Sequence, residues 1–394
     1  MNPIRLVDGA EPVDGADPVD GADPAEPYAQ RWFRVVRTCD TIVSGVRPAS
    51  LRERLARLAE STVDLDGRGD MYGDGPVTVL EERVAGLLGK PAAVFFPTGT
   101  MAQQVALRCW AERTGSSTVA LHPLSHPEMY ERRAFQSLSG LRGVWPTQEP
   151  RPPTAQEVRD LDEPFGTLLV ELPLREPGFL LPTWAQLVDT AAAARDRGAR
   201  VHFDGARLWE TTHHFGQDLP TIAGLADSVY VSFYKTLGGL SGAVLAGPAD
   251  LISAARAWRH RYGGNVFQQW PAALTALAGL DTILPQIESY VEHAAVVAAA
   301  LAELPGARVH PAVPHTHQFQ LWLPHPAEVL NEAALHLAQV SKTWFAGRWS
   351  DRPPTGLSMT EITVAAPALE LSSAAVSAAA HAFLATIPPT PRRS

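Results

Sequence analysis

Lysine is rare in this chain, and one lysine stands where an amine could do chemistry. The only lysines among the 33 lysine and arginine residues of the 394-residue sequence are Lys90, Lys235 and Lys342. Lys235 ends the apolar run 228–235 and is followed by a glycine-rich turn, TLGGLSG. An unpaired ammonium is costly at the end of a buried strand, and desolvation lowers the pKa of an amine and makes it a nucleophile. Lys235 is therefore a candidate for imine formation, whereas the other two lysines have the setting of surface charges.

A carboxylate ends another predicted strand. Asp204 follows the predicted strand 201–203 in VHFDGARLWE, and Gly205 opens a turn that presents Arg207. Capping of a helix is the simplest use of such an aspartate, and a metal ion or a protonated heteroaromatic nitrogen are the alternative partners. Ligands of open α/β sheets collect at the carboxyl ends of strands, where Asp204 and Lys235 are both expected. The two together favour an aspartate that pairs with a pyridine nitrogen, as in pyridoxal phosphate chemistry.

The segment PTGTMAQQ, residues 97–104, has the pattern of a strand end, a turn and a helix start. Backbone N–H groups, the hydroxyls of Thr98 and Thr100 and the positive helix end suit a phosphate near Gly99. A helix end contributes only about 0.3–2 kcal/mol, so it positions a phosphate rather than retaining a cofactor alone. By itself the turn is a weak signal and in most proteins is just an ordinary helix N-cap. The sequence lacks the GxxxxGK(S/T) and GxGxxG patterns, so nucleotide and dinucleotide binding have no support.

Histidine spacing gives no metal site. His122 and His126 are four residues apart, but Pro123 and Pro127 disfavour the helix that such a pair needs, so we expect no zinc there. His315 and His317 have no third ligand nearby in the sequence and are expected to be ordinary surface or core histidines.

Helical and strand patterns alternate along most of the chain, which predicts an α/β fold with a mostly parallel sheet covered by helices on both faces. We expect a disordered acidic tail over 1–27, a large domain over 28–275, a smaller α+β domain over 276–387 and a short tail over 388–394. The elements predicted from the patterns are helices at 51–60, 77–88, 101–113, 183–197, 249–261 and within 269–303, and strands at 92–96, 117–121, 167–171, 201–203, 228–234, 242–246, 307–311, 317–323 and 360–364.

Charge and composition exclude several classes of protein. The formal net charge is -9, and a repeat of VDGAEP and VDGADP at 7–24 concentrates the acidity in the first 27 residues. The rest of the chain is nearly neutral, which gives no electrostatic reason to bind nucleic acid. No apolar run approaches the roughly 20 residues of a membrane span, and no secretory signal is visible. Two cysteines, Cys39 and Cys109, cannot form a disulfide framework, so we expect a cytoplasmic protein.

In combination these motifs resemble a fold-type-I pyridoxal-phosphate enzyme, and most closely the L-threonine aldolase family of β-eliminating lyases. The resemblance covers about 71–275 well and the remainder loosely. It rests on the segments MYGDGPVTVLEERVAGLLGK at 71–90, FFPTGTMAQQVALR at 95–108, SHPEMYERRAFQSLSG at 125–140, VHFDGARLWE at 201–210 and YKTLGGLSGAVLAG at 234–247.

The resemblance implies pyridoxal 5'-phosphate as cofactor and assigns roles by position. Lys235 matches the Schiff-base lysine, Asp204 the partner of the pyridinium nitrogen, and His126 the histidine that stacks on the ring and is proposed as a base. These three are the implied catalytic residues. The full set of residues implied to bind the cofactor is Thr98, Gly99, Thr100, His126, Asp204, Arg207, Ser232 and Lys235.

The chain also departs from the family pattern. Tyr234 precedes the lysine where the family usually has a serine, and the nearest serine is Ser232. Phe267 stands where an arginine is common, Cys39 where a serine is common, and Glu361 where the last strand often has an arginine. The loss of basic residues affects the substrate more than the fold or the cofactor.

The implied activity is cleavage of the Cα–Cβ bond of a β-hydroxy-α-amino acid to an aldehyde and glycine or a related amino acid. Because the same cofactor also serves β-elimination, racemisation and transamination, these reactions remain alternatives, and so does a non-catalytic pyridoxal-phosphate-binding protein. The family also implies a homodimer or homotetramer with a small amino acid as substrate.

Overall fold

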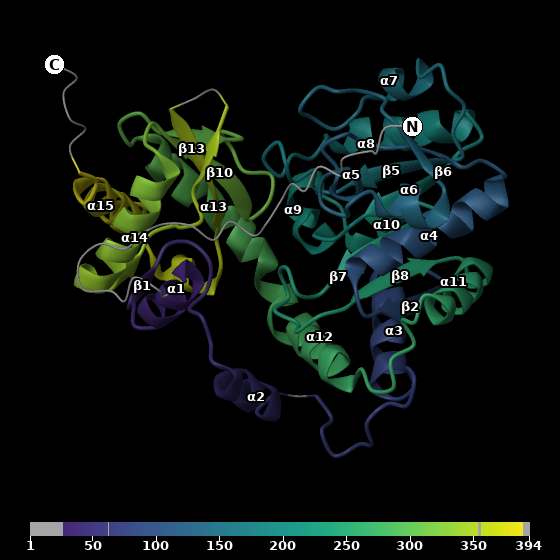
Figure 1. Cartoon of the computed structure of the whole chain (residues 1–394), viewed down its shortest axis with the longest axis horizontal. Helices are drawn as coiled ribbons and strands as arrows, with labels where there is room; N and C mark the ends of the chain where they lie inside the picture. Colours follow the sequence, from purple (N-terminus) through teal and green to yellow (C-terminus); the bar gives the residue numbers. More distant parts are fainter. Residues whose placement is uncertain (1–26, 62, 354–355, 389–394) are drawn as a thin grey trace, which may run out of the picture. The chain divides into compact units, whose positions relative to one another are not determined.

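The computed structural model describes residues 27–61, 63–353 and 356–388, so the acidic repeat at 7–24 and the last six residues lie outside the described residues. The chain forms two compact units (Figure 1). Of the described residues, the larger unit comprises those within 51–295 and 313–319, and the smaller one comprises those within 27–50, 296–312 and 320–388. The predicted boundaries, 28–275 and 276–387, remain a prediction, because a compact unit need not coincide with a folding domain.

The larger unit is built on a seven-stranded sheet with the order β2-β8-β7-β6-β5-β3-β4. Of the seven strands only β8 runs in the opposite direction to the other six, so the predicted mostly parallel sheet is confirmed. The bounds of the strands are β2 (Ala92–Phe96), β3 (Thr118–Ala120), β4 (Arg142–Val144), β5 (Thr167–Glu171), β6 (Arg200–Asp204), β7 (Ser228–Ser232) and β8 (Ala243–Gly247).

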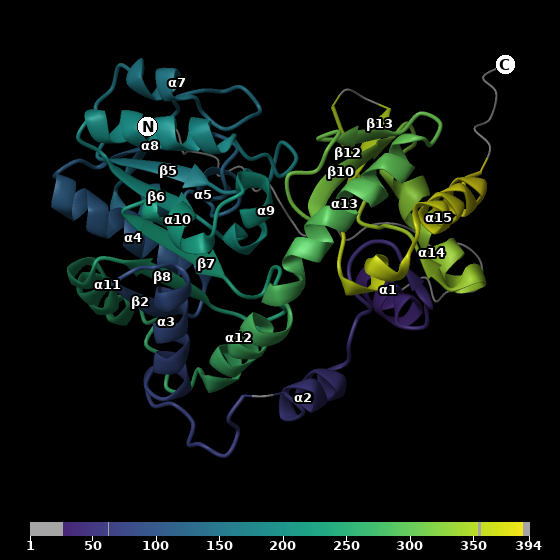
Figure 2. The same cartoon turned by 180° about the vertical axis from the view of Figure 1, so that it is seen from behind.

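Helices cover both faces of this sheet because successive side chains of a strand point to opposite sides. In β2, Val94 and Phe96 pack with one group of helices, whereas Ala93 and Phe95 pack with the other. The first group is α4 (Gly99–Thr114) and α11 (Ala249–Arg261), and the second includes α3 (Pro76–Leu87), α8 (Trp184–Asp196) and α12 (Trp270–Thr282). Figures 1 and 2 show α3 and α12 side by side. Burial on both sides explains why the strands read as continuous apolar runs.

Some observed elements differ from the predicted ones in their bounds. The helical stretch predicted within 269–303 is divided into α12 and α13 (Ile287–Ala302) by a single 3-10 turn that contains Pro285. Proline lacks an N–H group and therefore interrupts the helical hydrogen-bond ladder. The strand predicted at 228–234 ends at Ser232, and β4 was not predicted at all.

The smaller unit contains a four-stranded sheet with the order β12-β13-β10-β9, in which β12 pairs antiparallel with β13 and β9 with β10. Arg31 joins the N-terminal segment to this unit, because its guanidinium donates to both carboxylate oxygens of Glu332 at 3.0 and 2.8 Å. The bounds of the main elements are α1 (Tyr28–Val36), β9 (Arg308–His310), β10 (Gln318–Leu323), α14 (Ala327–Ser341), β12 (Ser350–Arg352), β13 (Leu357–Thr363) and α15 (Ser373–Ala385). No described helix has both the length and the hydropathy of a membrane-spanning segment.

Candidate active site

Three neighbouring strands end side by side and bring ionisable groups together. Glu171, the last residue of β5, is in register with Asp204, the last residue of β6, and Asp204 is in register with Tyr230 of β7. Lys235 follows three residues after the end of β7, so it lies at the same edge as Asp204. The pKa of Lys235 is lowered, first by burial and then by the charge of Arg207, while the nearby carboxylates oppose the shift. A neutral amine, the nucleophilic form, is thereby favoured.

Asp204 is a buried carboxylate whose charge acts on Lys235 but which forms no salt bridge with a described residue. Its side chain is almost fully enclosed, and Oδ1 accepts the N–H of Ala206 at 3.2 Å. No side-chain ion pair to Asp204 is found within the described ranges. A buried carboxylate without a direct ion pair is costly, so the site fits a ligand that brings a positive charge to this carboxylate. The protonated ring nitrogen of pyridoxal 5'-phosphate is such a group.

Glu171 was missed by sequence reasoning, although TLLVE ends on a carboxylate just as RVHFD does. Its side chain accepts the backbone N–H of His126 at 2.8 Å and that of Arg175 at 3.3 Å. Burial, and then the charge of Asp204, raises the pKa of Glu171 to about 7. Two adjacent carboxylates thus share this edge, and at neutral pH Glu171 is divided between its neutral and charged forms.

His126 begins the short helix α5 (His126–Met129), with Pro127 in its first turn. No helix joins His122 to His126, in agreement with the prediction, and Pro127 is tolerated in the first turn of α5 because a first-turn N–H has no helical partner to lose. His126 Nδ1 lies 3.2 Å from Glu131 Oε1, and Gln104 Nε2 donates to the other oxygen of Glu131 at 3.0 Å. If Nδ1 carries the proton, Nε2 keeps a lone pair and is the basic atom. The five-residue spacing of His126 and Glu131 gives no recognisable sequence signal.

The predicted phosphate turn forms the first turn of α4. Thr98 is the N-cap, and its hydroxyl accepts the N–H of Met101 at 3.2 Å. Gly99 and Thr100 follow as the first helical residues. A Cβ on Gly99 would lie 2.1 Å from the hydroxyl oxygen of Tyr230, so no other residue fits here without a shift. The helix start therefore offers free backbone N–H groups close to a tyrosine hydroxyl.

Arg207 and Ser232 flank Asp204 but differ in what they offer a ligand. Arg207 Cζ lies 5.3 Å from the ring centroid of Phe179, and its buried Nε has no hydrogen-bond partner among the described residues. An orphaned buried donor of this kind fits a ligand acceptor. The hydroxyl of Ser232 instead donates to the carbonyl of Ala206 at 2.9 Å, so its proton is committed to the protein.

A second ionisable cluster lies directly after Lys235. The hydroxyl of Thr236 donates to Glu210, which is completely buried, and His317 Nε2 lies 3.2 Å from the same carboxylate oxygen. Burial acts to raise the pKa of Glu210, but the charge and hydrogen bond of His317 outweigh it and lower the pKa. His315 Nδ1 accepts the N–H of Leu181 at 2.9 Å. Both histidines of the HxH pattern thus make contacts within the protein.

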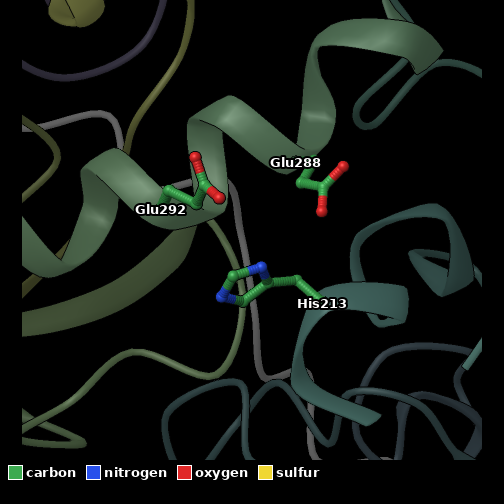
Figure 3. A group of neighbouring side chains, drawn as sticks. All are labelled: His213, Glu288 and Glu292. Atoms are coloured by element: carbon green, nitrogen blue, oxygen red, sulfur yellow. The ribbon is translucent and has the colours of Figure 1, made fainter. Parts of the chain in front are cut away.

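One group of described side chains has the composition of a metal site. His213 of α9 (Thr212–Phe215) faces Glu288 and Glu292 of α13, with ligand atoms within 4.8 Å of one another (Figure 3). All three side chains are exposed, and none belongs to the site above. Exposed carboxylates often gather without a cation, so this group carries no assignment.

Comparisons with known proteins agree with this geometry. The family model described as β-eliminating lyase matches residues 62–322. The low specificity L-threonine aldolase of Escherichia coli strain K12 is 30% identical over 245 residues, which is 59% of this chain and 72% of that protein. Two crystal structures superpose with a TM-score of 0.83 each.

The first of these structures is a putative aromatic amino acid β-eliminating lyase/threonine aldolase from Exiguobacterium, 33% identical, and the alignment covers 90% of this chain and 99% of that one. The second is a putative L-allo-threonine aldolase from Listeria monocytogenes, 30% identical, with coverage of 91% and 99%. Each aligns across both compact units, so the likeness extends well beyond the segments 71–275 on which the sequence motifs rest.

Proposed function

Because the chain belongs to the β-eliminating lyase family, whose cofactor is pyridoxal 5'-phosphate, we propose that it cleaves the Cα–Cβ bond of β-hydroxy-α-amino acids. The products are an aldehyde and glycine or a related amino acid. The names of the similar proteins support this reaction, since threonine aldolases recur among them. The observation that carries the proposal is the placement of Lys235, with its lowered pKa, at the same sheet edge as the buried Asp204.

Each residue of the edge has a part in this proposal. The bound cofactor supplies an electron sink in its protonated ring. Asp204 keeps the ring nitrogen protonated, because a buried carboxylate strongly favours a cationic partner. Lys235 provides the amine that holds the cofactor covalently. His126, held by Glu131, presents Nε2 as the base that takes the proton of the substrate's β-hydroxyl. Glu171 fixes the backbone of His126.

Turnover of a substrate panel tests the reaction. Purified protein with cofactor is expected to release aldehyde from threonine, allo-threonine or phenylserine. Lys235→Ala is expected to reduce aldehyde release to background, whereas Lys342→Ala, a change of an exposed lysine, leaves it unchanged. Absence of aldehyde from every member of the panel would exclude the aldolase reaction in favour of another reaction of the same cofactor.

The position of the cofactor is tested separately. Borohydride reduction of the holoprotein followed by peptide mapping is expected to place a pyridoxyl group on residue 235. A label on Lys90 or Lys342, or no label, would contradict the assignment of Lys235.

The environment and assembly of the protein belong to the same proposal. Cys39 and Cys109 are buried and unpaired, and burial raises the pKa of Cys109 to about 12, which supports a reducing, cytoplasmic location. We expect a homodimer or homotetramer that acts on a small amino acid. Light scattering coupled to size-exclusion chromatography checks the assembly, and a monomeric mass would contradict it.

A further inference from the structure

Two tyrosines stand beside the first turn of α4, and the proposed mechanism uses neither of them. Tyr230 is only 3% exposed, and its hydroxyl rests against Gly99, where a Cβ would lie 2.1 Å from the oxygen. The hydroxyl of Tyr230 therefore occupies space that a side chain at residue 99 would fill. A buried hydroxyl at the N-terminus of a 16-residue helix lies where anions bind.

Tyr234 continues this arrangement towards the surface. Its hydroxyl is hydrogen-bonded to that of Tyr230, and its side chain is 42% exposed. The pair therefore leads from the buried start of α4 to a position next to Lys235. Burial and the charge of Asp204 raise the pKa of both tyrosines, so both hydroxyls remain protonated donors at neutral pH.

A phosphate monoester at this helix start needs donors beyond the backbone. The helix end contributes only about 0.3–2 kcal/mol, and the hydroxyl of Thr98, which accepts the N–H of Met101, has a single proton to donate. Residue 267 is a phenylalanine that packs edge-on against Tyr72 and offers no donor. Arg259 is engaged by the carbonyl of Phe95 at 2.7 Å. The two tyrosine hydroxyls are further donors beside the backbone N–H groups of this helix start.

We propose that Tyr230 and Tyr234 form a hydroxyl relay that binds the phosphate group of the cofactor. Tyr230 donates to Tyr234, and Tyr234 donates to a phosphate oxygen next to the N–H groups of Gly99 and Thr100. Hydrogen bonds in such a chain strengthen one another, and a charged acceptor makes the last one the strongest. This inference rests on the proposed cofactor site but is independent of the aldol reaction.

The test compares two ligands that differ only in the phosphate. Cofactor-free protein is titrated with pyridoxal 5'-phosphate and with pyridoxal, and the dissociation constants are taken from absorbance. Tyr234→Phe is expected to weaken binding of the phosphorylated ligand about tenfold or more, because a hydrogen bond to a charged group is lost. Tyr230→Phe is expected to weaken it less. Neither substitution changes the affinity for pyridoxal.

Tyr262→Phe is the matched control, because the hydroxyl of Tyr262 contacts Arg108 and Ser139 rather than these groups. It is expected to leave both affinities unchanged. All three variants keep the aromatic ring, and circular dichroism with urea unfolding verifies that each is folded. Inorganic phosphate provides a second readout: it is expected to compete with the cofactor at higher concentrations in Tyr234→Phe than in the wild type.

Equal effects of Tyr234→Phe on both ligands, or no effect on either, would overturn the relay. Wild-type protein that binds neither ligand would instead contradict the proposed cofactor site, and the relay would fall with it. The two failures are thus distinguishable without any measurement of turnover.

Discussion

Two buried glutamates, Glu171 and Glu210, belong to the same unit and experience opposite electrostatic environments. Both lose their hydration on folding, which alone raises the pKa of a carboxyl group. Glu171 stands beside another carboxylate, Asp204, and its pKa rises to about 7. Glu210 stands beside His317, and its pKa is lowered. The charge of the neighbour, rather than the depth of burial, decides which form of each glutamate the fold prefers.

The comparison separates a region arranged for ligands from a region arranged for stability. At the strand ends, like charges are held together, which costs folding free energy and is typical of sites that bind or react. In the Glu210 cluster, opposite charges and the hydroxyl of Thr236 satisfy one another. Because Thr236 follows Lys235, this cluster also anchors the segment that carries the reactive amine.

The largest expected effect is that of Glu210→Gln. The change leaves His317 buried without its counter-charge, and breaking a buried ion pair in this way costs about 3–5 kcal/mol. Urea unfolding of the cofactor-free protein at pH 7 measures the loss, with the exposed Glu288→Gln as control. Because the pKa of Glu210 is lowered on folding, the difference from the wild type should shrink as the pH falls below about 4.5, where the unfolded carboxyl gains its proton. A loss under about 1 kcal/mol would mean that the pair is not an anchor.

Glu171→Gln should show the opposite dependence on pH. The folded protein holds a proton on Glu171 up to about pH 7, whereas the unfolded chain releases it near 4.5, so the wild type loses stability between these values as the pH rises. The shift corresponds to about 3 kcal/mol. Relative to the wild type, the variant should therefore gain up to about 3 kcal/mol between pH 5 and pH 8, measured by urea unfolding of cofactor-free protein. A pH-independent difference would show that Glu171 is ionised throughout this range.

A smaller effect is expected for Thr236→Val, which keeps the shape of the side chain and removes its hydrogen bond to the charged Glu210. The loss should be about 1.5–3 kcal/mol of unfolding free energy. If the cluster anchors the lysine segment, amide hydrogen exchange should also become faster around residues 235–237. Unchanged exchange together with unchanged stability would remove the link between the two regions.

Ser232→Ala should have the smallest effect. The hydroxyl of Ser232 is buried and donates to a neutral carbonyl, that of Ala206, so its removal should cost about 0.5–1.5 kcal/mol. The affinity for pyridoxal 5'-phosphate should change little if the hydroxyl serves the protein alone. A tenfold weaker cofactor affinity would instead restore Ser232 to the set of residues that bind the ligand.

The sequence was sufficient to predict those features that depend on a residue's type and on its position within a single helix or strand. The family, the α/β fold and the cofactor were predicted and are confirmed. Asp204, Lys235 and Gly99 could be singled out because each lies at or shortly after the end of a predicted strand. Their roles in binding and catalysis stay predictions.

The sequence was not sufficient where a partner comes from another part of the chain. The contact of Glu131 with His126 and that of Tyr230 with Gly99 depend on side-chain geometry between separate elements. The grouping of 28–50 with the C-terminal unit depends on long-range packing such as the pair of Arg31 and Glu332. The helix α15 is rich in alanine, so its apolar stripe is faint, and it was not predicted.

The reversed direction of β8 determines how the segment after Lys235 can vary. Since β7 and β8 are antiparallel neighbours, residues 233–242 join adjacent strands as a hairpin and need no crossover helix. Both ends of this hairpin are clamped by the ladder, and Gly242 packs so tightly on Phe95 that a Cβ would lie 2.3 Å from its ring. Residues inserted near the exposed Leu240 would therefore lengthen the tip of the hairpin. The register of β7, the strand that precedes Lys235, would be preserved.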